Sequence, residues 1–332
     1  MSPVRRCLLP AAAAVLAALP ARALPAPPAA PATVRPPAVA GLFYPADANE
    51  LRKTVDGLLG KWQRKPVGKV RALICPHAGY EWSGLTAAAA YRQLDANAIH
   101  TAIVLAPSHY TLFRGASVAA LAAYRTPLGQ VPVAPLAAEL ARSGPFVRGP
   151  ECRVFRPGWW RQSPARAAAG VAETPHTWEH SLEVQLPFLQ RVLKDFRLVP
   201  VVFGDVDAAE AAKALLPHLD DATLVVASSD LSHQHPYEEA RRLDAGCVRA
   251  ALALDSGAMA RQEACGKGPI LTVLQLASVK GWKPILMDYR TSGDAPGGPR
   301  SGVVGYMSFI FVEAAKDKAS SAPAPGAKGT AP

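Results

Sequence analysis

The sequence predicts an α/β protein in which a layered, mixed β-sheet is flanked by helices. Continuous apolar runs of strand length alternate with longer stretches of helical pattern. Runs without polar alternation are typical of strands that are covered on both faces. Helices that alternate with such strands indicate a layered sheet. The chain has 332 residues, half of them hydrophobic, which is enough for one large α/β domain or two modest ones.

The order of the expected elements follows from these runs. Strands are expected at 70–75, 101–108, 198–204, 222–230, 284–290 and 302–313. Helices are expected at about 49–61, 83–94, 133–143, 180–194, 207–218, 235–253 and 269–280. The last two strands have the pattern of a meander, so we expect mixed strand directions. In sheets of this kind, ligands collect at the carboxyl ends of the strands.

The two ends of the chain have the composition of segments outside the folded domain. Residues 1–23 have the layout of a secretory signal peptide: Arg5 and Arg6, an apolar run at 8–20, and "ARA" at 21–23. The run is shorter than the roughly 20 residues of a membrane span, and no other stretch could form one. We therefore expect a periplasmic or secreted protein. Residues 24–38 are a Pro/Ala-rich linker, 39–314 the α/β domain, and 315–332 a disordered tail.

Charge and cysteine content exclude two classes of protein. The net charge of +10 falls to +7 when cleavage removes Arg5, Arg6 and Arg22, which is too little to indicate nucleic-acid binding. No CxxC spacing occurs, so a zinc ribbon is not encoded. Cys7 lies in the signal peptide, and the other four could pair in an oxidising compartment: Cys75, Cys152, Cys247 and Cys265.

Polar side chains follow three of the expected strands, at the point where each strand ends. His77 follows the strand at 70–75, and His109 follows the strand at 101–108. The strand at 222–230 ends in "SSDLSH", which offers Ser229, Asp230 and His233. Hydrogen-bonding groups placed there need partners or water. A metal ion or a reacting substrate would supply such a partner.

Two further motifs carry groups that could reach the same edge. His180 and Glu183 lie at i and i+3, on one face of the helix expected at 180–194. They either border a pocket, or Glu183 supports the positive end of a helix that begins at Thr177 or Ser181. Cys265 precedes a Gly-rich turn that opens a helix, where backbone N–H groups can lower a thiol pKa. The alternative for Cys265 is a small buried apolar residue.

The residues alone leave two kinds of chemistry open at this edge. Two imidazoles with a thiolate suit zinc, iron or copper. A cysteine hydrolase would instead need one cysteine, one histidine and an oxyanion site.

Several motifs stand in the order found in a known family. They are "AGLFYPAD" (40–47), "PHAGYEWSG" (76–84), "LAPSHY" (105–110), "HSLEVQLPFL" (180–189), "SSDLSH" (228–233) and "CGKGPI" (265–270). With them the chain resembles the Memo family, also called AmmeMemoRadiSam system protein B. The resemblance implies a fold similar to class III extradiol dioxygenases, which use non-haem iron. It also implies metal binding through His77, His109 and Cys265. At Tyr110 the sequence departs from the family, which often has a second histidine there.

The functional expectation is a metal-binding, dioxygenase-like redox enzyme that acts on a small molecule or peptide in the metal cleft. Iron is the expected metal, with copper or zinc as alternatives. Asp230 would orient or deprotonate a bound group, and His233 would act as general acid or base. The expected substrate-binding residues are Tyr80, Ser229, His180 and Glu183. The alternatives are a non-catalytic module that binds a peptide or an anion, and a metal-assisted hydrolase. The oligomeric state stays open.

Overall fold

The computed structural model describes residues 33–119, 121–150, 152–168 and 173–313. The expected signal peptide, the linker up to residue 32 and the expected tail at 315–332 lie outside the described residues. The last part of the expected linker at 24–38 is structured, contrary to the prediction. Val34–Arg35 form strand β1, and Arg35 is buried.

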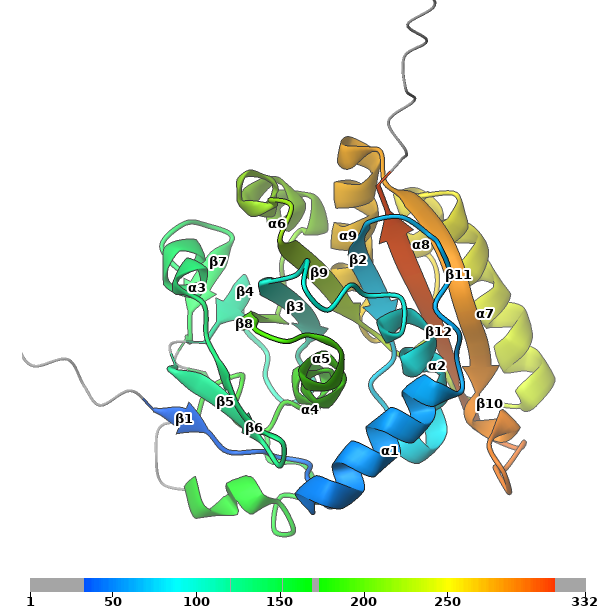
Figure 1. The fold of residues 1–332 in the computed structure, drawn as a ribbon, viewed down its shortest axis with the longest axis horizontal. Coiled ribbons are helices and arrows are strands. Elements are labelled where there is room, and N and C mark those ends of the chain that lie inside the picture. Colours follow the sequence, from blue (N-terminus) through cyan, green and yellow to red (C-terminus); the bar gives the residue numbers. More distant parts are fainter. Residues whose placement is uncertain (1–32, 120, 151, 169–172, 314–332) are drawn as a thin grey trace, which may run out of the picture. The chain divides into compact units, whose positions relative to one another are not determined.

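The main sheet is mixed, as the sequence predicts (Figure 1). It has nine strands in the order β10-β12-β2-β9-β3-β8-β4-β7, with β11 paired to β12. Its centre is parallel and consists of β2 (Val70–Cys75), β9 (Thr223–Ser228), β3 (Thr101–Pro107) and β8 (Arg197–Phe203). The expected final meander is confirmed, because β11 (Lys283–Thr291) and β12 (Val303–Val312) pair antiparallel.

Short strands that the sequence analysis did not predict complete the sheets. At the edges of the main sheet these are β4 (Ala116–Val118), β7 (Phe146–Arg148) and β10 (His233–His235). A separate three-stranded sheet consists of β1, β5 (Ala123–Thr126) and β6 (Gly129–Pro132). Segments of two to four residues are too short for an apolar run to identify them.

Helices cover both faces of the main sheet (Figure 1). On one face lie α1 (Ala48–Gly60), α2 (Tyr80–Tyr91), α4 (His180–Glu183) and α5 (Leu186–Val192). On the other lie α3 (Pro135–Leu140), α6 (Ala208–Leu215), α7 (Tyr237–Leu252), α8 (Ser256–Ala260) and α9 (Lys267–Lys280). Alternate residues of β2 enter the two cores: Leu73 and Cys75 the first, Ala72 and Ile74 the second.

The helix expected at 180–194 is interrupted between α4 and α5. Pro187 has no backbone N–H, so it cannot continue the hydrogen bonds of α4. Gln185 lies at the break, and its side-chain amide donates to Ser228 Oγ at 2.8 Å and to the Pro76 carbonyl at 2.9 Å. Through these hydrogen bonds Gln185 connects the segment between α4 and α5 to the carboxyl ends of β2 and β9.

A buried ion pair holds the first described residues against α4. Arg35 pairs with Glu183, and both side chains are nearly inaccessible to solvent. Glu183 also accepts hydrogen bonds from the backbone N–H of Ala38 at 2.7 Å, from that of Val39 at 3.0 Å and from the Tyr44 hydroxyl. Every oxygen of this carboxylate therefore has a partner in the core.

We expect Glu183→Gln to lower the free energy of unfolding by about 3 kcal/mol or more. The change leaves the Arg35 guanidinium buried without its counter-charge. Urea unfolding measures the loss. The matched control is Asp56→Asn, which breaks the exposed Arg191–Asp56 pair and should cost less than about 1 kcal/mol. Equal losses in the two variants would contradict this account of the Arg35–Glu183 pair.

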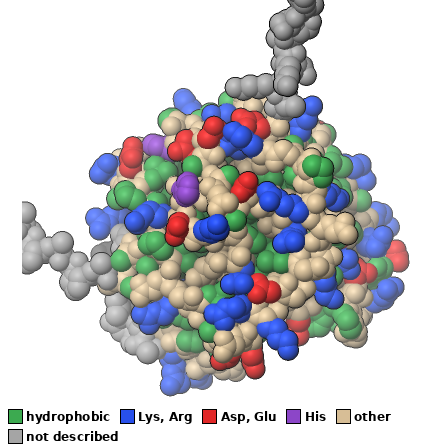
Figure 2. Space-filling model, viewed as in Figure 1, with side chains coloured by type: hydrophobic (Ala, Val, Ile, Leu, Met, Phe, Trp, Pro, Cys, Tyr) green, Lys and Arg blue, Asp and Glu red, His purple; other side chains and the backbone are tan. Residues whose placement is uncertain are grey.

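The described residues show no membrane-spanning helix, a mixed distribution of charge on one face and no disulfide bond. No described helix is long and apolar enough to cross a membrane. On the face shown in Figure 2, Lys and Arg side chains are interspersed with Asp and Glu. The cysteines within the described ranges, at positions 75, 152, 247 and 265, are all free.

Candidate metal centre

The carboxyl ends of the parallel strands bring the predicted ligands together. His77 lies two residues beyond β2, His109 two beyond β3, and Asp230 two beyond β9. Since β2, β9 and β3 are parallel neighbours, their ends meet at one edge of the sheet. This is the edge at which the sequence predicts a ligand site.

Cys265 joins the two histidines at this edge. Its Sγ lies 3.1 Å from His77 Nε2. The ligand atoms of His77, His109 and Cys265 all lie within 4.8 Å of one another. His77 is buried, whereas 27% of the His109 side chain is exposed, so the cluster opens toward solvent on the His109 side.

Gly266 allows the loop that carries Cys265 to press against the end of β9. The Gly266 N–H donates to Ser229 Oγ at 2.9 Å. A Cβ at this position would lie 2.2 Å from the Ser228 carbonyl oxygen, so only glycine fits there without a shift of the backbone. Ser229, predicted to bind substrate, is fully buried and its hydroxyl donates to the Asp230 carbonyl at 2.7 Å. In this structure Ser229 therefore positions the Cys265 loop.

The hydrogen bonds of Ser228 fix the tautomer of His77. The Ser228 hydroxyl has one proton, and it donates that proton to the Ser181 carbonyl at 2.6 Å. Its contact of 2.8 Å with His77 Nδ1 must then be a bond that Nδ1–H donates. Nε2 is therefore the ring nitrogen of His77 that faces Cys265.

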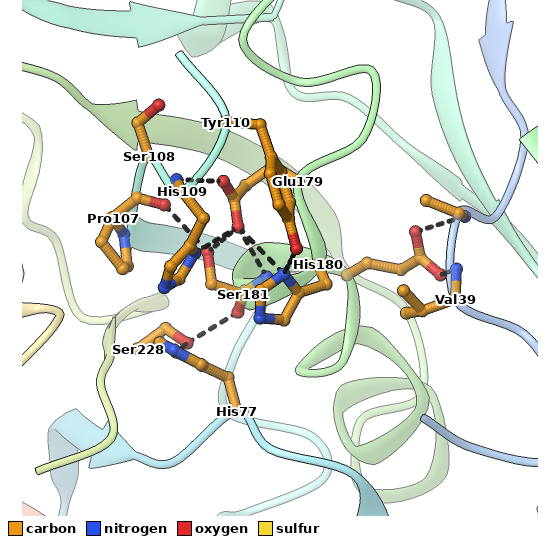
Figure 3. A network of polar contacts seen from close by, with 12 residues as sticks. Val39, His77, Pro107, Ser108, His109, Tyr110, Glu179, His180, Ser181 and Ser228 are labelled. Carbon is orange, nitrogen blue, oxygen red and sulfur yellow. Dashed lines mark hydrogen bonds and ion pairs between the residues drawn. The ribbon is translucent and has the colours of Figure 1, made fainter. Parts of the chain in front are cut away.

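Glu179 fixes the tautomer of His109 in the same way (Figure 3). Glu179 Oε1 lies 2.8 Å from His109 Nδ1, and Oε2 accepts the His109 backbone N–H at 2.7 Å. A carboxylate only accepts, so Nδ1 carries a proton that it donates to Glu179, and Nε2 is the nitrogen left for a ligand. Histidines that bind metals commonly have their other ring nitrogen held by a carboxylate or a similar acceptor.

The charges of the cluster shift the pKa values of its members. Burial opposes ionisation of the Cys265 thiol, but His77 and His109 outweigh burial and lower its pKa to about 6. Burial opposes protonation of His109, but Glu179 outweighs it and raises the pKa of His109 to about 10. Burial likewise opposes ionisation of Glu179, yet His109 holds the pKa of that carboxyl far below its usual range. Without a metal, the site thus favours a Cys265 thiolate beside a protonated His109.

Asp230 lies against the same cluster. Its Oδ1 accepts the His77 backbone N–H at 2.7 Å, and its Oδ2 lies 3.9 Å from His77 Nε2. Burial raises the pKa of Asp230 to about 6, despite the hydrogen bond from His77. The predicted closeness of Asp230 to the histidines is therefore observed.

His180 is the third histidine of the cluster, and its ring lies beside those of His77 and His109. Its ring centroid lies 4.6 Å from that of His109 and 5.5 Å from that of His77 (Figure 3). Burial, together with the neighbouring histidines, lowers the pKa of His180 well below its usual value. The Tyr110 hydroxyl lies 3.0 Å from His180 Nδ1, and the Trp159 ring packs edge-on against Tyr110. The residue that departs from the family pattern thus contacts the site directly.

Three of the predicted site residues make their hydrogen bonds elsewhere. The Tyr80 hydroxyl donates to the Val184 carbonyl at 2.6 Å, and its ring packs against Phe188. Glu183 pairs with Arg35 in the core. His233 is exposed on β10, where its backbone N–H donates to Glu263 at 2.9 Å. A catalytic role for His233 stays a prediction.

Sequence reasoning missed Glu179, Ser228 and Gln185. A signal for Glu179 was present in "TWEHS", where a carboxylate precedes a candidate histidine. The structure makes Glu179 the N-cap of α4, since its side chain accepts from the Ser181 N–H. The helix therefore begins at residue 180, as expected, and the alternative in which Thr177 or Ser181 starts it is wrong. Ser228 and Gln185 have no local signal, because only their long-range bonds reveal them.

A second group of potential ligands consists of His109, Glu179 and His180. Glu179 Oε1 already accepts from His109 Nδ1, from the Ser181 N–H at 3.0 Å and from the Ser181 hydroxyl at 2.8 Å. A carboxylate with this many donors is better suited to orient a ligand than to be one. The group of His77, His109 and Cys265 is therefore the better candidate.

Comparison with known proteins matches residues 35–310 to the model of the family described as "Memo-like protein". The chain belongs to the Memo family. A "MEMO1 family protein" of Aquifex aeolicus is 34% identical over 291 residues, which cover 84% of this chain and 99% of that protein. A "MEMO1 family protein" of Methanopyrus kandleri is 34% identical, with 83% of this chain and 98% of that protein covered. One of Sulfolobus acidocaldarius is also 34% identical, with 84% and 99% covered.

The Memo match places the candidate metal centre inside the family domain. The matched range contains His77, His109, Glu179, Asp230 and Cys265. The mixed sheet flanked by helices agrees with the Memo fold, which is similar to that of class III extradiol dioxygenases. The predictions of the Memo family and of an α/β fold with a mixed sheet are thus both confirmed.

Proposed function

We propose that this Memo protein binds a divalent transition metal through His77, His109 and Cys265 and is a redox enzyme. The observation that supports it most is the pair of imidazoles whose Nδ1 protons are held by Ser228 and Glu179. In both rings Nε2 is the nitrogen left for a ligand, beside a thiol of lowered pKa. Metal ligation requires neutral imidazoles and a thiolate, so a bound metal would displace the second proton of His109, whose pKa is raised to about 10.

The donor set fits the proposed metal chemistry. Two nitrogens and one sulfur suit iron, copper or zinc, and iron is the metal we propose, with copper as the alternative because of the soft sulfur. Three protein ligands leave coordination positions open for oxygen or substrate. A bound iron would supply electron transfer and Lewis acidity.

The other residues of the cluster would handle protons. Asp230 would hold or accept a proton beside His77, since its Oδ2 lies 3.9 Å from Nε2 of that ring. Tyr110 and His180, joined at 3.0 Å, would form a second donor on the His109 side. His233 would exchange protons with solvent from its exposed position on β10.

Oxygen consumption tests the redox proposal. Iron-loaded protein should consume oxygen with catechol-like or thiol substrates, and His109→Ala should abolish that consumption together with metal binding. His233→Gln should slow turnover and keep the metal. A protein that holds iron but neither consumes oxygen nor hydrolyses any substrate would refute the enzyme and leave a binding module for a peptide or an anion. Hydrolysis without oxygen consumption would favour a metal-assisted hydrolase.

We also propose export to the periplasm or the medium. The support is the signal-peptide layout of residues 1–23. Amino-terminal sequencing of protein from the native host should find Leu24 first. Intact Met1 in a cytoplasmic fraction would refute export.

A further inference from the structure

The turn at residues 176–179 leads into α4 and ends in Glu179, the residue that orients His109 (Figure 3). The Glu179 carboxylate bonds both the ring Nδ1 and the backbone N–H of His109. His180 follows directly, and its ring lies 4.6 Å from that of His109. The backbone of this turn therefore determines where the Glu179 carboxylate meets the His109 ring.

The Arg35 guanidinium holds both ends of this turn. Its Nε donates to the His176 carbonyl at 2.7 Å, and its Nη2 donates to the Glu179 carbonyl at 2.8 Å. Its Nη1 donates to the Glu183 carboxylate, at the end of α4. A planar guanidinium has several donors in a fixed arrangement, so one side chain can hold three acceptors at set positions.

The surroundings of Arg35 fix its own position. The residue is buried in β1, and its backbone partner in the parallel pair of β1 and β5 is Tyr124. The guanidinium carbon lies 4.9 Å from the centre of the Tyr124 ring. The Tyr124 hydroxyl in turn lies 2.7 Å from His176 Nδ1. A side chain held in this way can keep the residues that it contacts in one geometry.

A role as counter-charge for Glu183 does not by itself explain the contacts of Arg35. The ion pair needs only the bond from Nη1 to the carboxylate. The bonds to the His176 and Glu179 carbonyls add nothing to the charge balance, but they fix the backbone behind the carboxylate that orients His109. Contacts behind a ligating histidine and its carboxylate commonly tune metal affinity.

We infer that Arg35 is a positioning residue of the metal centre, which fixes the turn at 176–179 so that Glu179 holds the His109 ring for metal binding. The inference rests on the proposed function in that a metal binds through His109. The hydrogen bond between Glu179 and His109 is present without a metal, so the role of Arg35 can also be tested in metal-free protein.

Zinc(II) titration of the full-length Arg35→Lys variant, in competition with a chelator of known affinity, tests the inference. An ammonium keeps the charge beside Glu183 but cannot hold both carbonyls in the geometry of a guanidinium. The zinc affinity should fall at least about tenfold. Glu183→Gln keeps the two carbonyl bonds, so it should lower stability more than Arg35→Lys and zinc affinity less. A merely structural role of Arg35 predicts that the losses of stability and of affinity run in parallel.

The double variant Arg35→Met/Glu183→Gln separates folding from positioning if Arg35→Lys does not fold. It removes both buried charges and leaves an amide oxygen that can accept from the donors around position 183. Its zinc affinity should also fall at least about tenfold, because the His176 and Glu179 carbonyls lose their donor.

Arg71→Lys is the matched control. Arg71 is also buried, donates to the Asp221 carbonyl at 2.8 Å and pairs with the carboxylates of Asp221 and Glu313. It lies near the start of β2, whereas His77 follows the end of that strand. Arg71→Lys should therefore leave zinc affinity unchanged.

Nuclear magnetic resonance of chelator-treated protein gives a reading that does not depend on metal. The His109 Nδ1–H proton, held by buried Glu179, should give a signal that exchanges slowly with water. Arg35→Lys should lose or broaden this signal, and Arg71→Lys should keep it. An unchanged zinc affinity or an unchanged His109 signal in folded Arg35→Lys would overturn the inference. If the protein binds no metal but the signal depends on Arg35, the metal proposal fails and the positioning of His109 by Arg35 stands.

Discussion

Protein with serine in place of Cys265 is expected to lose its bound metal, with an affinity lower by more than about a hundredfold. The thiol of Cys265 meets His77 Nε2 at 3.1 Å and has a pKa lowered to about 6, so it provides the soft, anionic ligand of the proposed site. A serine hydroxyl stays protonated at neutral pH and binds these metals weakly. Metal analysis after purification without oxygen or chelator gives the result.

Cys152→Ser is the control for this experiment. Cys152 is partly exposed, and its Sγ donates to the Pro150 carbonyl at 3.3 Å. That variant should retain the metal content of the unaltered protein. If Cys265→Ser retains as much metal as the unaltered protein, Cys265 is not a metal ligand.

The second large effect is expected from Glu179→Gln. The substitution keeps the shape of the side chain and removes the charge that holds His109 Nδ1–H at 2.8 Å. An amide presents both a donor and an acceptor, so the tautomer of His109 is no longer fixed. Metal affinity should fall about 10- to 100-fold, as is typical when a carboxylate behind a ligating histidine is lost.

Glu263→Gln controls for the loss of a carboxylate near the predicted catalytic histidine. Glu263 binds the His233 backbone and the His235 ring, which lies 3.0 Å away, and contributes to neither group of potential ligands. Its variant should bind metal as before. Unchanged metal affinity in Glu179→Gln, with the fold intact, would contradict the orienting role of Glu179.

The main strands and the two histidines could be predicted because their signals are local. Continuous apolar runs such as 70–75 and 101–108 identify the central strands, and a polar residue just beyond such a run lies at the edge of the sheet. Cys265 lies on no strand. Its assignment required the family resemblance in "CGKGPI".

The parts that could not be predicted depend on contacts between distant segments. Glu183 and His180 lie three residues apart, but Glu183 pairs with Arg35, 148 residues away, whereas His180 lies at the metal centre. Both side chains are consistent with one helix face in the sequence. Both residues lie in α4, and the position of β1, which brings Arg35 to Glu183, separates their roles.

The most direct test of the account is X-ray absorption spectroscopy of the metal in protein that has been purified without oxygen or chelator. We expect one metal ion per chain, with two imidazole nitrogens and one sulfur in its coordination sphere. Metal–nitrogen and metal–sulfur distances should be about 2.1 Å and about 2.3 Å, and the sulfur should vanish from the spectrum of any metal left in Cys265→Ser. A protein that holds no metal, or a metal bound by oxygen and nitrogen alone, would contradict it.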